Sequence, residues 1–274
     1  MVCHETYKDQ ENTWLSPEEV STEDGKNFYK KQNPLEEVIV GPTESMSKSK
    51  KNTIDPENII KNYGADSVRL FILSDSPPEK DVQWSDQGMM ASFKFIQKLW
   101  ILNSKILEKI KNNSEIAENE KLTKFTNRLI HKVTQNLEKF HYNVIVANLY
   151  EMYNFLIKEV EKPIKKEALV ENYRKILILM SPFMPHFTSE CLANLNQKDV
   201  KWPTVSGEDL IQEEINFVVQ INAKKRAILL VKRDLKENEV LNEIKSNVAT
   251  EKLLKNQKVK KIIFVSNKLI NIIV

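Results

Sequence analysis

Apolar residues recur at intervals of three and four through the middle of the chain, which predicts helices between about residues 86 and 197. The clearest run follows the candidate capping residues Ser85 and Asp86 and continues to about Lys111. Similar spacing predicts further helices at about 122–137, 144–157 and 166–180, and a shorter one after Pro185. Because helices with short connections bury their apolar faces against one another, we expect an antiparallel bundle.

Both ends of the chain show a different pattern. The first 44 residues contain short strand-like runs, at about 1–7, 13–15, 27–31 and 37–41, and Asn33-Pro34 and Gly41-Pro42 are predicted to interrupt them. After a connector at 202–207, strands are predicted at 215–221, 227–232, 259–265 and 269–274, and helices at 236–245 and 250–254. The expected fold class is therefore mainly α with α+β ends, in three parts: 1–85, 86–200 and 209–274.

Composition narrows the class of protein. The 274 residues are 41% hydrophobic and 29% charged, as in ordinary soluble proteins, with no apolar run long enough for a membrane span. The N-terminus lacks the apolar core of a secretory signal, so we expect a cytoplasmic protein with no membrane partner. Cys3 and Cys191 form no C-x-x-C pair and the four histidines form no metal motif, so both cysteines are expected to be buried and no metal to be bound by this chain alone.

Positive charge is concentrated near the C-terminus. The formal net charge is only +3, but residues 209–274 contain 13 Lys and Arg against 8 Asp and Glu. The cations cluster at Lys224, Lys225 and Arg226 and again at Lys260 and Lys261. Such clusters bind phosphodiester backbones by releasing counterions, although a solvated basic surface is an equally open interpretation.

The most informative segment is the hydroxyl-rich lysine stretch Ser45-Met46-Ser47-Lys48-Ser49. Lysine supplies a compact cation with three donors, and the serines supply hydroxyls and backbone N–H groups, so the stretch is suited to phosphate. A strong helix start follows, with Asp55 as the expected N-cap and Pro56 in the first turn, and Gly64 is the expected stop. A bare Ser/Lys stretch is usually only a solvated turn, so its context decides the interpretation.

That context resembles one family. The lysine stretch is similar to the KMSKS signature of class I aminoacyl-tRNA synthetases, with Ser45 in place of the first lysine, and the following order of Asp55-Pro56, Tyr63-Gly64-Ala65-Asp66 and Arg69-Leu70-Phe71 resembles the Leu, Ile, Val, Met and Cys enzymes. The resemblance implies that Lys48 is catalytic and acts on ATP, which is expected to carry Mg²⁺. It also implies that ATP contacts Ser45, Met46, Ser47, Lys48 and Ser49.

The C-terminal residues resemble the last domain of bacterial leucyl-tRNA synthetases, from Phe217 to Ala227 and from Lys260 to Val274. This implies leucine-tRNA ligase activity, with tRNA(Leu) as a partner that contacts Lys224, Lys225, Arg226, Lys260 and Lys261. Residues 86–200 would then be an anticodon-binding-type bundle, and residues 1–85 the end of a Rossmann-like catalytic domain with a β insertion. The aromatic residues of the bundle and His186 are expected to be core or capping residues.

Only part of such an enzyme is recognisable. The chain contains no H-x-G-H motif and no editing domain, so by itself it is expected not to make leucyl-adenylate. A truncated product and a small subunit that binds leucine and ATP with a separate N-terminal synthetase subunit both fit. The alternative function is a non-catalytic tRNA-binding protein derived from a synthetase, which the loss of a cation at Ser45 mildly favours.

Overall fold

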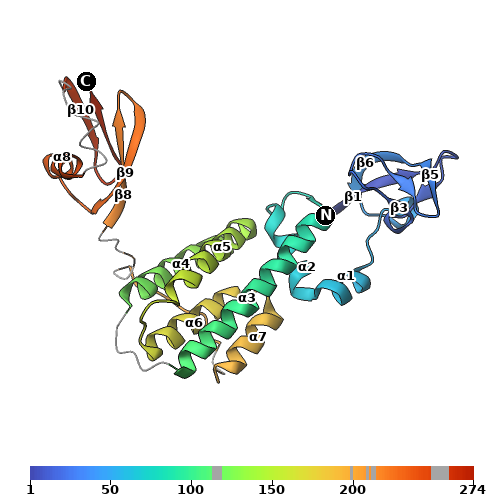
Figure 1. The fold of residues 1–274 in the computed structure, drawn as a ribbon, viewed down its shortest axis with the longest axis horizontal. Coiled ribbons are helices and arrows are strands. Elements are labelled where there is room, and N and C mark those ends of the chain that lie inside the picture. Colours follow the sequence, from blue (N-terminus) through green and yellow to red (C-terminus); the bar gives the residue numbers. More distant parts are fainter. Residues whose placement is uncertain (113–118, 198–199, 208–209, 211–213, 248–258) are drawn as a thin grey trace. The chain divides into compact units, whose positions relative to one another are not determined.

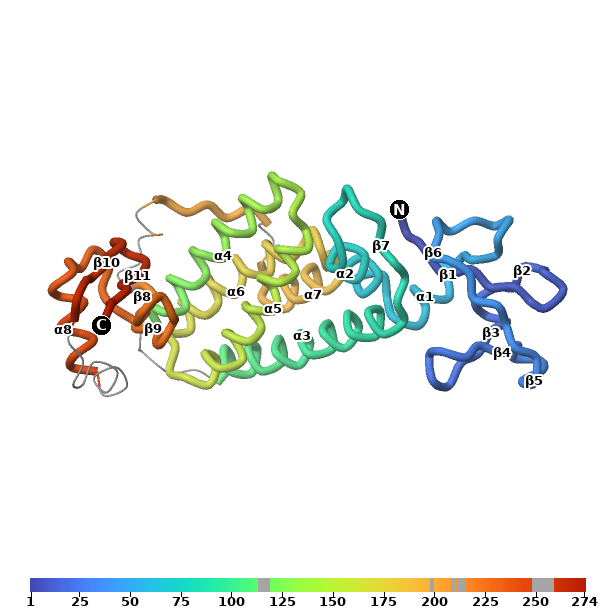
Figure 2. The backbone as a smooth tube through the Cα atoms, turned by 90° about the horizontal axis from the view of Figure 1, so that it is seen from above, coloured from blue at the N-terminus to red at the C-terminus, as the bar shows by residue number. Residues whose placement is uncertain are grey.

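The computed structural model describes residues 1–112, 119–197, 200–207, 210, 214–247 and 259–274 (Figures 1 and 2). It divides into two compact units, Met1–Ser206 and Gly207–Val274. The first unit contains the β-rich segment and seven of the described α-helices, and the second is a small α+β unit. The expected class, mainly α with α+β ends, is confirmed, whereas the division into three parts stays a prediction. The helix predicted at 250–254 lies outside the described residues.

The N-terminal sheet is built around β1 (Val2–Lys8). This strand pairs antiparallel with β2 (Trp14–Leu15) and β6 (Ile39–Ser45), and parallel with β7 (Val82–Gln83). A second antiparallel sheet contains β3 (Val20–Ser21), β4 (Tyr29–Lys30) and β5 (Asn33–Glu37). The parallel pair brings the first residues of the chain beside residues that follow the second helix.

Two predicted strand breaks are wrong, because strands continue through Asn33-Pro34 and Gly41-Pro42. Each proline lies in a strand at the edge of its sheet, where a missing N–H costs no ladder hydrogen bond. A Cβ atom at Gly41 would lie 2.4 Å from the Thr6 hydroxyl, so a larger residue there would force the Thr6 side chain to move. That hydroxyl donates to the Pro42 carbonyl across the strand pair at 3.1 Å.

The helices begin and end close to their predicted positions. They are α1 (Pro56–Tyr63), α2 (Ala65–Asp75), α3 (Asp86–Asn112), α4 (Glu120–Glu138), α5 (Tyr142–Glu159), α6 (Lys166–Met180) and α7 (Pro185–Asn194). Asp55 caps α1 as expected, its carboxylate accepting from the Glu57 N–H at 3.0 Å. Among the described residues, no helix is sufficiently long and apolar to cross a membrane.

The bundle has one continuous apolar core, to which α2 and helices α3 to α7 contribute. The apolar stripes predicted from sequence supply it, including the fully buried Leu149, Ile176 and Leu177. Cys191 lies in this core and Cys3 is buried in the N-terminal sheet, which confirms the prediction that both are buried. Burial raises the pKa of the Cys191 thiol to about 12, so it has little thiolate character.

The C-terminal unit is a four-stranded sheet covered by one described helix. The strand order is β10 (Lys261–Val265), β11 (Leu269–Ile273), β8 (Glu214–Ile221) and β9 (Lys224–Lys232). Helix α8 (Glu237–Ser246) buries Val240 and Ile244 against the sheet residues Phe217, Val219, Leu229, Val231, Ile270 and Ile272. Asn222 and Ala223 have φ angles of 48° and 62°, as a tight two-residue hairpin turn requires.

Helix α2 is joined to α7 by a buried carboxylate. Asp66 accepts from the Phe187 N–H at 2.7 Å and contacts the His186 ring Nδ1 at 2.9 Å. These donors are at the N-terminus of α7, where the helix dipole also favours a negative charge. His186 is therefore not a core residue, since its side chain is 75% exposed, and the carboxylate of Asp66 rather than the histidine caps the helix.

Replacing Asp66 with alanine should destabilise the first unit, because the α7 donors would lose their buried partner. We expect a loss of about 1–3 kcal/mol in the free energy of unfolding. Urea unfolding followed by circular dichroism measures this loss. Asp75→Ala, which removes an exposed carboxylate at the end of the same helix, is the matched control, and equal stabilities of the two variants would contradict the capping role.

Candidate functional site

The lysine loop connects the edge strand β6 to helix α1. The Met46 N–H donates to the Val2 carbonyl at 3.2 Å, which extends the sheet one residue beyond β6. Lys48–Lys50 then forms a single 3-10 turn, and the Lys51 N–H donates to the Lys48 carbonyl at 3.3 Å. Lys51 has a φ angle of 52°, so the chain reverses there before it enters Asn52 and the cap of α1.

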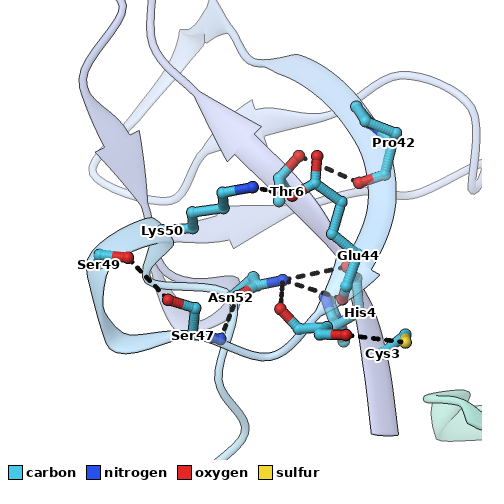
Figure 3. A network of polar contacts seen from close by, with 10 residues as sticks. Cys3, His4, Thr6, Pro42, Glu44, Ser47, Ser49, Lys50 and Asn52 are labelled. Atoms are coloured by element: carbon cyan, nitrogen blue, oxygen red, sulfur yellow. Dashed lines mark hydrogen bonds and ion pairs between the residues drawn. The ribbon is translucent and has the colours of Figure 1, made fainter. Parts of the chain in front are cut away.

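Asn52 holds both ends of this loop (Figure 3). Its side chain is fully buried, and its Oδ1 accepts from the Ser47 N–H at 2.8 Å. Its Nδ2 donates toward the carbonyls of His4, Glu44 and Ser45 at 3.3, 3.3 and 3.4 Å. One carboxamide therefore connects the loop to both β1 and β6, and fixes the backbone on which Lys48 is presented.

Some side chains of the loop interact with other side chains of the protein, whereas Lys48 does not among the residues that the structure describes. Lys50 forms an ion pair with Glu44, and the hydroxyls of Ser47 and Ser49 are 2.7 Å apart. Lys48 is exposed, and no hydrogen bond or ion pair engages its ammonium group within the part of the chain that the structure describes. The arrangement therefore presents the Lys48 ammonium group beside two hydroxyls, which is suited to an anion that approaches from solvent.

Ser45 and Met46 lie deeper than Lys48. Both are half-buried, and Ser45 lies opposite Cys3 in the pairing of β6 with β1. The Ser45 hydroxyl is 4.0 Å from the Cys3 sulfur, so this hydroxyl points toward β1. The serine at this position leaves Lys48 and Lys50 as the cations of the segment 45–50.

The two basic clusters of the tail lie at the same end of the sheet, on its opposite edge strands β9 and β10. Lys224 follows the β8–β9 turn and is paired with Ile221, which in turn is paired with Ile272 of β11. Lys261 is paired with Ile273 of the same strand, β11. Both clusters therefore lie at one end of the sheet, and all five cations, Lys224, Lys225, Arg226, Lys260 and Lys261, are exposed.

Sequence reasoning missed Asn52 and Glu44. Asn52 directly follows the lysine stretch and precedes the Asp55 cap, but its burial depends on β1, a segment 48 residues away. A buried amide with four backbone partners could not be recognised from local sequence. No group of three or more His, Cys, Asp or Glu side chains among the described residues is arranged to hold a metal ion.

Replacing Asn52 with alanine should release the loop without unfolding the sheet. The Ser47 amide would lose its acceptor, so its hydrogen exchange should accelerate about 5- to 100-fold, as expected for a buried hydrogen bond. Hydrogen exchange measured by mass spectrometry over residues 44–54 tests this. Asn58→Ala on the exposed side of α1 is the matched control, and equal exchange in the two variants would show that Asn52 does not hold the loop.

Comparison with known proteins relates both units to one class of enzyme. Residues 9–85 match the family model "tRNA synthetases class I (I, L, M and V)", and residues 119–241 match "Anticodon-binding domain of tRNA ligase". The leucine–tRNA ligases of Bradyrhizobium sp. strain BTAi1 and Bartonella tribocorum are 34% and 36% identical to the chain over its whole length. The chain spans about one third of those relatives, 33% and 32% respectively.

A solved structure agrees with these relatives. The LeuRS of Agrobacterium radiobacter K84, determined in a ternary complex with tRNA and LeuAMS, superimposes with a TM-score of 0.69 and 26% identity. The match covers 83% of this chain and 31% of that protein. Over its whole length the chain is therefore similar to the C-terminal part of leucyl-tRNA synthetases.

Proposed function

We propose that this chain supplies the phosphate-binding loop and the tRNA-binding surfaces of a leucine-tRNA ligase. The observation that carries the proposal is the relationship of the whole chain to leucine–tRNA ligases, combined with an exposed Lys48 on a loop whose backbone Asn52 holds. In this family of reactions the leucine carboxylate attacks the α-phosphorus of ATP, and pyrophosphate leaves. Negative charge on the phosphates must be neutralised as the bond to the leaving group breaks.

Lys48 is the group that performs this neutralisation. Its ammonium is a compact charge that can follow the phosphates as they move, and a preorganised donor of this kind contributes about 3–4 kcal/mol to lowering the barrier. Ser47 and Ser49 supply hydroxyl and N–H donors to the same phosphates, while Ser45 and Met46 line the base of the loop. Mg²⁺ is expected to arrive with ATP.

The tRNA(Leu) partner is bound by the bundle and by the basic end of the tail sheet. Lys224, Lys225, Arg226, Lys260 and Lys261 contact its phosphates, which suits recognition of RNA by shape and backbone. The H-x-G-H motif and leucine pocket are not found in this sequence, so adenylation requires an N-terminal half of the synthetase. We place the protein in the cytoplasm, where tRNA is charged.

A second function, tRNA binding without catalysis, is favoured by one observation. Ser45 replaces a lysine of the family signature, and the nearby Lys50 is engaged by Glu44. Only Lys48 of the segment 45–50 then remains to act on ATP. If one cation is insufficient, the bundle and tail would still bind tRNA, and the two functions differ in whether Lys48 affects adenylation.

Lys48→Ala should depress pyrophosphate exchange about 100- to 1000-fold in a complex reconstituted with an N-terminal half that contains the H-x-G-H motif. The affinity for tRNA should be nearly unchanged, because one exposed cation far from a phosphate track adds little. Pyrophosphate exchange and filter binding measure the two effects. Lys61→Ala on α1 is the control of equal charge, and equal exchange rates for the two variants would favour the non-catalytic function.

Triple substitution of Lys224, Lys225 and Arg226 by alanine should weaken tRNA binding and reduce its salt dependence. Each phosphate contact contributes about 0.7–0.9 to the slope of log K against log salt concentration, so the slope should fall by about 2–3. The matched control substitutes Lys232, Arg233 and Lys268, which removes the same charge away from the β8–β9 turn. Equal slopes for the two triple variants would show that the effect is one of net charge alone.

A further inference from the structure

Phe140 occupies a backbone conformation that ordinarily selects glycine. Helix α4 ends at Glu138, and Phe140 follows with a φ angle of 56°. Its N–H donates to the Leu137 carbonyl at 3.1 Å, and the His141 N–H donates to the Asn136 carbonyl at 2.9 Å. This pair of bonds is the Schellman termination, in which the residue in the left-handed region is usually glycine. A bulky aromatic residue there is a conformational outlier.

The ring of Phe140 is also outside the core. It is 58% exposed, so the expectation that the aromatic residues of the bundle are core residues is wrong at this position. The ring centroids of Phe140 and Tyr142 are 6.0 Å apart in an edge contact. Tyr142 in turn packs against the buried Phe183, with the ring centroids 6.1 Å apart. Tyr142 therefore contacts the Phe140 ring on one side, while another part of the ring faces solvent. Both its conformation and its exposure are unfavourable for stability.

Helix α4 presents a row of cations that leads to Phe140. Lys121, Lys124, Arg128, Lys132 and Lys139 recur at intervals of three, four, four and seven residues, which places them on one face of a helix with 3.6 residues per turn. Lys124 and Lys132 form ion pairs with Glu120 and Glu151 at 3.2 and 3.5 Å, but such exposed pairs are weak and can exchange for phosphates. We call these five residues the α4 basic row.

We infer that Phe140 is a stacking platform for an unpaired nucleobase of tRNA, and that the α4 basic row binds the adjoining phosphates. Exposed aromatic rings beside cationic tracks are the combination by which proteins hold unstacked bases, because every base has a π-face. A protein partner would use the apolar ring, whereas a row of cations on one face is suited to a phosphate backbone. This inference rests on the proposed tRNA-binding function and adds a specific binding residue to it.

Three substitutions of Phe140 in the full chain test the inference, with an unmodified tRNA(Leu) transcript as the probe. Phe140→Gly removes the ring and suits the left-handed conformation, so it should raise the melting temperature by about 2–4 °C. The same variant should bind tRNA about 5- to 100-fold more weakly, with an unchanged salt slope, because no charge is lost. Phe140→Trp should retain binding within about threefold, since a larger ring still stacks.

Phe140→Leu is the matched control, because it keeps an apolar side chain and the unfavourable backbone conformation but has no ring. It should bind tRNA as weakly as the glycine variant and show no gain in melting temperature. Tight binding by either the leucine or the glycine variant would overturn the stacking role, as would a glycine variant that is less stable than the parent. Failure of the unchanged chain to bind tRNA would instead overturn the proposed function, and the stacking role with it.

Discussion

The lysine loop depends on one buried carboxamide. Asn52 replaces solvent as the partner of the Ser47 N–H and of three carbonyls, and so connects β1, β6 and the start of α1 in one network. Since the loop otherwise consists of a single 3-10 turn with exposed side chains, its backbone would sample many positions without this anchor. The defined placement of Lys48, which its proposed contact with a phosphate requires, therefore follows from the buried Asn52.

A comparable polar anchor operates between the helices. Asp66 satisfies the N-terminus of α7, while Arg69 one turn later donates to the Pro182 carbonyl at 2.7 Å just before that helix. Both residues belong to the segment that follows the lysine loop in sequence, so the loop and the bundle are linked through α1 and α2.

The sequence predicted local structure correctly where the interacting residues are close neighbours along the chain. The cap of α1 by Asp55 uses a donor two residues away, and the spacing of apolar residues alone predicted the buried faces of the bundle helices. The exposed cations of the tail were identified as clusters from sequence, but their placement at one end of the sheet was not. That placement depends on the pairing of β11 with both β8 and β10, which no local pattern specifies.

The errors of prediction have two different physical causes. Pro34 and Pro42 were expected to break strands, yet both are accommodated because their strands lie at sheet edges. Phe140 was expected in the core, but helix α4 ends at Glu138, and Phe140 follows in the left-handed conformation with its ring exposed. By itself the sequence determined the helical periods, the α1 cap and the membership of the lysine stretch in a recognisable signature, since these depend on near neighbours. Only the tertiary structure decided that Asn52 is buried, that Asp66 caps α7 and that the basic clusters share one end of the sheet, because each depends on segments distant in sequence that packing brings together.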